Sequence, residues 1–428
     1  MNAKLGSSAL GGILLTVTLA AYFSAFHGDF HYDDTLTVLD NPHVESLYSF
    51  IGHLDHMVRP VLYATFLFDR SLYGLNPVGY HLLNIVLHIG SGLLIYMILT
   101  RAMREQPSPI PFWTALLFLI HPMTSETVTY ISGRASGLMS FFYLLALFLY
   151  VRWFDQPAER RWAYLSGAVA SFVLSIGSKE AAVTLPIILL LWDTLIRRLR
   201  GSDIRAAMLS RHSPFWLVLL LAATWAWYHP RYTALAQFSS EIRPVWDHML
   251  SQGHVIVYSL GLYFTPWRQS FDHDLPVFHS LTQWPLPLDL LLVLGLAAAV
   301  IISARRLPVV AFGLSWFVIQ LLPTSVIPRN DLLSERNLYL PAIGLTLAIV
   351  ALCWRVTQWL TTIFHRPALI RVGSAAFAIA LVFMLCFSTY QRNRLYEDRL
   401  LLWSDAVRKS PNKARPHNNL GYAYSLHG

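Results

Sequence analysis

Long apolar runs separated by short polar loops dominate this chain. Eleven runs predict membrane-spanning helices over residues 9–26, 79–100, 111–123, 137–153, 162–178, 182–196, 214–229, 285–304, 308–323, 338–358 and 368–390. Several are shorter than the roughly 20 residues that cross a hydrocarbon core of about 30 Å, so their helices should extend into the loops. The pattern predicts an all-α, polytopic membrane protein.

The composition agrees with this pattern. Of the 428 residues, 55% are hydrophobic and 13% are charged, and the mean hydropathy is +0.46. Soluble domains carry about 25% charged residues, so this chain has the profile of an integral membrane protein. The first run follows Lys4 and is longer than the core of a typical secretion signal. Because ten more runs follow, we expect it to remain as an anchor.

The charges are distributed by side of the membrane. Sixteen Lys and Arg residues, Lys4 included, fall on the side of the N-terminus, and nine fall in the opposite loops before residue 391. The acidic residues have the reverse distribution, because 19 of the 24 fall on the opposite side. Positive loops stay in the cytosol, so the N-terminus is expected inside. The net charge of +8 therefore indicates topology, and no nucleic-acid partner is expected. Cys353 and Cys386 lie in predicted spans, and core packing is expected of them.

Four external regions are long or polar enough to build a site. They are residues 26–78, the turns at 121–136 and 177–180, residues 228–285, and residues 323–337. The first is too long to be a simple connection. The third contains an apolar stretch, 254–264, which is too short to span and is expected to be re-entrant or interfacial.

The strongest candidates for chemistry are Asp33 and Asp34, which open the first external loop just after the first apolar run. A charged pair at a membrane boundary is costly unless it faces water, a partner or a substrate. Adjacent carboxylates repel, which favours a proton on one of them or a cation nearby. A carboxylate placed at a cavity is suited to act as general base for a hydroxyl. The alternative is an Asp-Asp turn that caps an interfacial helix.

Charged residues also mark three other external boundaries. Glu126 and Arg134 are eight residues apart, about two helical turns, so both could point into one cavity or form a boundary salt bridge. Lys179 lies between the fifth and sixth spans. Arg336 precedes the tenth span, and its fork of donors suits a phosphate, with snorkelling to lipid headgroups as the alternative.

Two other polar groups are weaker candidates. Asp272 and His273 could ligate a divalent metal ion together with the acidic pair, but a solvated turn explains them as well. His81, Asn84 and His88 repeat on one face of the second span, where they either hydrogen bond between helices or line a cavity. The chain has no phosphate-binding Gly-rich loop, HExxH or GxSxG motif, so an activated, membrane-soluble substrate must drive any reaction.

The composition changes after residue 390 to a soluble helical pattern. Its small and Leu-Gly positions are those of a tetratricopeptide repeat: Trp403, Ala406, Pro411, Ala414, Asn419, Leu420, Gly421 and Ala423. A lone repeat cannot bury its apolar face, so it either continues into an array or docks on the membrane domain. We expect a membrane domain over 1–390 and an external TPR-like helical segment over 391–428.

The external motifs together resemble a known family. The matching residues are Phe30, Tyr32-Asp33-Asp34, Arg59-Pro60, Gly79-Tyr80-His81-Leu82-Leu83-Asn84, Leu87-His88, His121-Pro122, Glu126, Gly133-Arg134, Ser178-Lys179-Glu180, Glu335-Arg336 and Leu338-Tyr339-Leu340-Pro341. In this order they resemble the transmembrane-and-TPR O-mannosyltransferase family, which is similar to the GT-C class of polytopic glycosyltransferases and related to the protein O-mannosyltransferases.

The resemblance implies a GT-C-type bundle of about eleven helices with a long first external loop. It implies transfer of mannose or another hexose from a polyprenyl-phosphate donor to a hydroxyl group, usually on Ser or Thr of a protein, with inversion and on the non-cytosolic face. Asp33 would be the base and Asp34 its support. The expected donor-phosphate contacts are Arg336, Arg134 and Lys179, with Glu126, Glu335, Tyr339, His81 and Arg59 supporting the site.

Two other classes compete with this interpretation. A lipid-linked-sugar flippase or transporter would show internal repeats with interrupted helices, and no convincing repeat is found. A non-catalytic membrane scaffold would use the terminal repeat alone and would not need the external acids.

Overall fold

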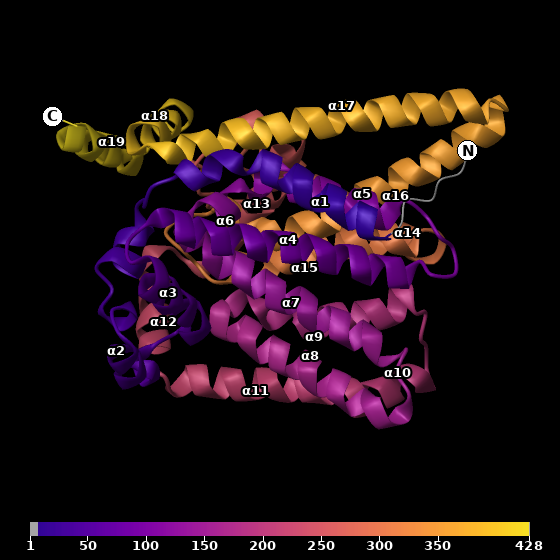
Figure 1. Cartoon of the computed structure of the whole chain (residues 1–428), viewed down its shortest axis with the longest axis horizontal. Helices are drawn as coiled ribbons and strands as arrows, with labels where there is room; N and C mark the ends of the chain where they lie inside the picture. Colours follow the sequence, from indigo (N-terminus) through magenta and orange to yellow (C-terminus); the bar gives the residue numbers. More distant parts are fainter. Residues whose placement is uncertain (1–6, 428) are drawn as a thin grey trace.

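The computed structural model describes residues 7–427, and over this range the chain is helical and contains no β-strand (Figure 1). The all-α class predicted from the apolar pattern is therefore confirmed. Lys4, which entered the charge count, lies outside the described residues.

Each predicted span coincides with a helix. These helices are α1 (Ser7–Ala21), α4 (Pro77–Ala102), α5 (Ile110–Ile120), α7 (Arg134–Trp153), α8 (Ala158–Ser178), α9 (Leu185–Leu191), α11 (Ser213–Tyr228), α14 (Leu286–Arg306), α15 (Pro308–Val326), α16 (Tyr339–Phe364) and α17 (Pro367–Arg394). Within residues 7–427, seven segments are long and apolar enough to cross a membrane, namely those of α4, α7, α11, α14, α15, α16 and α17, while α1 and α5 are apolar but shorter. The protein is thus an integral, multi-pass membrane protein, and the count of eleven crossings stays a prediction.

The long helices lie side by side, and the connections gather at two ends of the bundle (Figure 1). The helices at the left-hand end in that view are α2 (Leu47–Gly52), α3 (Pro60–Tyr73), α12 (Pro230–Ile242), α18 (Arg399–Lys409) and α19 (Ala414–His427). The opposite end holds α10 (Ser202–Ala207). The loops predicted to be external therefore share one end, where hydrogen bonds join Arg59 to Glu180 and Ser239 to the carbonyl of Pro328.

Two glycines bring α15 and α16 into close contact. A methyl group on Gly313 would collide with the carbonyl oxygen of Gly344, and the reverse also holds. Small residues let helix backbones approach closely in a membrane, where helices associate by packing. Trp316 adds a hydrogen bond of 2.7 Å from Nε1 to the carbonyl of Leu340. These contacts position the start of α16, directly after Arg336.

The polar face of α4 makes hydrogen bonds to other segments. The Nδ1 atom of His88 lies 2.8 Å from the hydroxyl of Tyr339 on α16, and Nε2 of His81 lies 3.2 Å from the carbonyl of Gly28. Asn84 donates to the backbone of α6 (Ser125–Thr129). Of the two alternatives for this face, the structure has the interhelical hydrogen bonds.

Two segments extend beyond the bounds that the apolar pattern predicts. The stretch 254–264 is the C-terminal half of α13 (Val245–Phe264), which packs against α14 and α15. Helix α17 passes the predicted domain boundary at residue 390 and ends at Arg394. The following α18 and α19 pack on each other, and this helix pair is held against the external loops by ion pairs. Its identity as a tetratricopeptide repeat stays a prediction.

Candidate active site

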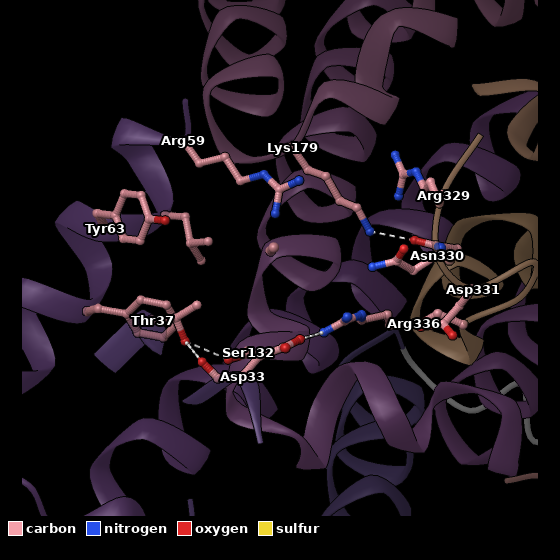
Figure 2. Close-up of a pocket in the computed structure, with 15 residues that line it drawn as sticks. Asp33, Thr37, Arg59, Tyr63, Ser132, Lys179, Arg329, Asn330, Asp331 and Arg336 are labelled. Carbon is pink, nitrogen blue, oxygen red and sulfur yellow. Dashed lines mark hydrogen bonds and ion pairs between the residues drawn. The ribbon is translucent and has the colours of Figure 1, made fainter. Parts of the chain in front are cut away.

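A cavity of about 250 Å³ lies where the external loops gather (Figure 2). Its walls come from the first loop and α3, the start of α7, the turn after α8, and the loop before α16. The lining residues are Asp33, Thr37, Arg59, Leu62, Tyr63, Phe66, Ser132, Ala135, Lys179, Arg329, Asn330, Asp331, Ser334, Arg336 and Asn337. Four are cations and two are carboxylates, so the cavity suits an anionic ligand.

The two adjacent carboxylates of the first loop have different surroundings. Asp33 lines the cavity, and its side chain is 34% exposed. Asp34 is fully buried and accepts hydrogen bonds from the backbone N–H groups of His31 (2.8 Å) and Ser132 (2.7 Å), and from the Ser132 hydroxyl. Burial raises the pKa of Asp34 to about 7 in spite of these donors. Asp34 therefore ties the loop to the start of α7, while Asp33 is left to face a ligand.

Arg336 connects the first loop to the last external loop before α16. Its Nη1 donates to Asp33 at 2.9 Å, and its Nε lies 3.8 Å from Glu126 (Figure 2 shows the first pair). Burial opposes its charge, but Tyr130, Asp33 and Glu126 together raise the pKa of Arg336 above its usual range. Within residues 7–427 its guanidinium makes no other hydrogen bond to protein, so donors remain for an anion in the cavity.

Two buried glutamates, Glu126 and Glu335, lie next to Arg336. Glu126 accepts hydrogen bonds from the Arg336 backbone N–H and the Ser334 hydroxyl, both at 3.2 Å. Its burial, aided by Glu335 and opposed by Arg336, raises the pKa of Glu126 to about 7. Burial alone would raise the pKa of Glu335 as well, but Arg392 and His273 hold it below its usual value.

Three further cations face the cavity (Figure 2). Lys179 is buried, and its Nζ donates to Ser136 (2.7 Å) and Asn337 (2.6 Å). Burial and the neighbouring Arg329 lower the pKa of Lys179 well below its usual value. Arg59 is paired with Glu180 at 2.9 Å. An anion entering this cavity would stabilise the charged form of Lys179 and compensate its cationic neighbours.

The candidate metal ligands are occupied by other partners. Asp272 pairs with Lys413 at 2.6 Å and with Arg415, and His273 lies 2.8 Å from Glu335. No group of three or more His, Cys, Asp or Glu side chains suited to a metal ion occurs in the part of the chain that the structure describes.

Three other residues expected at the site lie outside the cavity. Arg134 is fully buried, and its guanidinium contacts Asp69 (2.5 Å), Asn84 (2.7 Å) and the carbonyl of Tyr80 (2.9 Å). His81 and Tyr339 make the interhelical hydrogen bonds described above. The structure therefore brings together Asp33, Arg336, Lys179 and Arg59, with Glu126 and Glu335 behind Arg336.

Sequence reasoning missed several lining residues. Arg329, Asn330 and Asp331 form a polar triplet after Pro328, in a short loop between two apolar spans. That position in the sequence could have identified the triplet as a candidate for lining the site. No local signal points to Asp69, which lies within the amphipathic α3 and meets Arg134 only in the folded chain.

Comparisons with known proteins agree with the resemblance seen in the sequence. No family model matches the chain. The curated relatives include a protein O-mannosyl-transferase of Caenorhabditis elegans, which is 27% identical over 96% of this chain and 59% of the relative. The Drosophila melanogaster Tmtc3 protein is 24% identical over 96% of this chain and 52% of its own length. The Homo sapiens TMTC1 protein is 22% identical over 97% of this chain and 53% of its own length. The resemblance to the transmembrane-and-TPR O-mannosyltransferases is thus confirmed. The chain spans about half the length of these relatives.

Two solved structures are similar in fold. One is the Archaeoglobus fulgidus oligosaccharyltransferase in the apo form, with a TM-score of 0.48 and 13% identity, covering 98% of this chain and 60% of that one. The other is ArnT from Cupriavidus metallidurans bound to undecaprenyl phosphate, with a TM-score of 0.44 and 14% identity, covering 94% of this chain and 78% of that one.

Proposed function

We propose that this chain is a membrane glycosyltransferase that moves a hexose, with mannose as the first candidate, from a polyprenyl-phosphate donor to the hydroxyl of a protein Ser or Thr. The observation that carries the proposal is a single arrangement: Asp33 faces a cationic cavity and is joined to Arg336 at 2.9 Å. The relatives named as protein O-mannosyl-transferases support the reaction class.

The donor phosphate belongs among the cations of the cavity. Arg336 presents a fork that fits two phosphate oxygens, while Lys179 acts as a compact charge. Arg329 and Arg59 add to the positive field at the same cavity. Because these side chains come from three separate loops, a phosphate bound there would join loops that otherwise repel one another.

The transfer step needs one base and one stabilised leaving group. The acceptor hydroxyl oxygen forms a bond to the anomeric carbon on the face opposite the phosphate, and its proton passes to Asp33. The bond from the anomeric carbon to the phosphate oxygen breaks, and its electron pair stays on that oxygen. Arg336 and Lys179 stabilise this added charge. Because the hydroxyl attacks from the face opposite the phosphate, the configuration at the anomeric carbon inverts.

The proposal includes the side of the membrane and the division of the chain. The cavity would lie on the non-cytosolic face, with residues 1–390 forming the transfer domain and residues 391–428 an external helical segment. The donor and acceptor would then meet at the bundle end that carries the polar loops.

The test is turnover of purified full-length chain with a panel of polyprenyl-phosphate sugars and Ser/Thr peptides, with and without EDTA. Asp33→Asn keeps the shape but removes the base, so transfer should fall by about 10² to 10⁴ while donor binding persists. Asp34→Asn should reduce transfer less, because Asp34 is buried against Ser132. Asp55→Asn, an exposed carboxylate in the same loop, is the matched control.

Normal transfer by Asp33→Asn together with a dead Asp34→Asn would reverse the two roles. Activity in both variants would remove this loop from the catalytic site. A wild-type chain that transfers no sugar from any donor would overturn the proposed function.

A further inference from the structure

A second, smaller cavity also borders the Asp33–Arg336 pair. It measures about 30 Å³ and shares Asp33, Asp331, Ser334 and Arg336 with the cationic cavity. The two cavities thus meet at the proposed base. A group bound in the smaller one would reach Asp33 through walls that do not include Lys179, Arg329 and Arg59.

The walls of this second cavity differ in chemistry from those of the first. Aromatic rings of Tyr32, Tyr130, Phe271 and Trp403 surround it, and the cations Lys179, Arg329 and Arg59 take no part in its lining. It carries additional carboxylates, among them those of Glu126 and Asp272. Four carboxylates line this cavity against the two guanidinium groups of Arg336 and Arg415, so it is less favourable to a phosphate than the cationic cavity is, and it accepts a neutral hydroxyl and the backbone of a peptide.

The helix pair after the membrane domain contributes directly to this cavity. Trp403 of α18 and Arg415 of α19 line it. The Trp403 ring packs edge-to-face on Phe271, with centroids 5.3 Å apart. Arg415 donates from Nε to Asp272 at 2.6 Å and from Nη2 to Asp331 at 2.7 Å. The α18–α19 pair is therefore a fixed wall of the cavity.

The backbone conformation of Tyr32 is a second observation, independent of the cavity lining, that points to a binding site. Its φ of 37° is in the left-handed region, which a bulky residue rarely adopts. Its side chain is nevertheless 42% exposed, beside Trp403 (5.7 Å between centroids) and under the Arg415 guanidinium (5.7 Å). Strained backbone of this kind persists where the surroundings impose it, often at ligand clamps. The strain here turns a large aromatic ring into the cavity next to Asp33.

We infer that this second cavity is the acceptor site, that it takes a hydroxyl-bearing side chain of an extended peptide, and that the α18–α19 pair forms its outer wall. The inference rests on the proposed function and adds where the acceptor binds. This cavity of about 30 Å³ is far smaller than the cationic cavity of about 250 Å³, so it suits a Ser or Thr side chain better than a sugar ring.

The test is initial-rate kinetics of the full chain at saturating polyprenyl-phosphate mannose, with a set of ten-residue peptides that each hold one Ser or Thr. Tyr32→Ala and Trp403→Leu should raise the KM for the peptide by about two- to tenfold, the range of one aromatic contact, and leave the KM for the donor unchanged. Tyr32→Phe keeps the ring and should therefore raise the peptide KM less than Tyr32→Ala does. Tyr48→Ala in the same loop and Tyr424→Ala in α19 remove exposed aromatic rings away from the cavity and are the controls.

Peptide KM values within twofold of wild type for both Tyr32→Ala and Trp403→Leu would overturn the inference while leaving the proposed function intact. A donor KM that rises as much as the peptide KM would also overturn it, because the cavity would then serve the donor. A wild-type chain without transfer would refute the proposed function itself, and this inference with it.

Discussion

The buried ion pair between Arg134 and Asp69 yields a sharp prediction about stability. The two side chains are 0% and 1% exposed, and their charged atoms lie 2.5 Å apart. Replacing Asp69 with Leu would leave the Arg134 guanidinium buried without its counterion. Its remaining hydrogen-bond partners would be Asn84, Thr65 and the carbonyl of Tyr80. A buried cation without a counterion is costly because the protein interior solvates it poorly.

The expected cost is about 3–5 kcal/mol, the range for breaking a buried pair by removing one partner. In a chain of 428 residues such a loss corresponds to a fall in apparent melting temperature of about 3–6 °C. Asp69→Leu combined with Arg134→Met removes both charges and keeps similar volumes. This double variant should recover most of the lost stability, because apolar replacement of a whole buried pair is often neutral.

The assay is the fraction of detergent-solubilised protein that remains monodisperse after heating, measured for both single variants, the double variant and Asp55→Asn as an exposed control. A single Asp69→Leu variant that melts within about 2 °C of wild type would refute the reasoning. So would a double variant as unstable as the singles.

The same double variant tests the role of Arg134 in catalysis. If its donor KM stays at the wild-type value, Arg134 acts only in packing the loops. If the protein is stable but the donor KM rises tenfold or more, Arg134 contacts the phosphate, as the family resemblance implies.

Three further predictions concern the phosphate contact, pH and topology. Arg336→Ala should lower the transfer rate by about 10²- to 10³-fold, as the loss of one preorganised hydrogen-bond donor does. Arg336→Lys should recover only part of the wild-type rate, because Lys keeps the charge without the fork of donors. A fully active Lys variant would mean that charge alone suffices. Burial raises the pKa of Asp34 to about 7 in the folded chain, so between about pH 4 and 7 the folded state keeps a proton that the unfolded state has lost. The free energy of unfolding should therefore fall as pH rises through this interval. The thermal stability of wild type relative to Asp34→Asn should therefore decline from pH 5 to 7.5, and a constant difference would contradict this cause. Cysteines introduced at Ser202 and Asn412 should differ in labelling by an impermeant reagent in oriented vesicles, and equal labelling would reject the eleven-span topology.

Much of the fold could be predicted from the chain alone. An apolar run in a bilayer must satisfy its own backbone hydrogen bonds, so each of the eleven runs could be assigned to a helix without knowing its neighbours. The bounds were less certain, because α13 and α17 continue through polar sequence where packing, rather than hydropathy, extends the helix.

Part of the candidate site was also predictable. Asp33, Lys179 and Arg336 stand out because charges at the ends of apolar spans are costly and must have partners. Which partner each one takes is a matter of tertiary structure. Asp33 and Arg336 are 303 residues apart, and no local pattern relates them.

The different environments of neighbouring or similar residues were decided only by the fold. Asp33 and Asp34 are adjacent and chemically identical, yet Asp34 is buried beneath Ser132 while Asp33 faces the cavity. Arg134 and Arg336 are both arginines at span boundaries, yet only Arg336 lines the cavity, because Asp69 holds the other in the interior. The sequence by itself determined which segments are helical and where charge must be compensated. The packing of distant loops decided which charges meet, since electrostatic and hydrogen-bond energies depend on distances that only the folded chain defines.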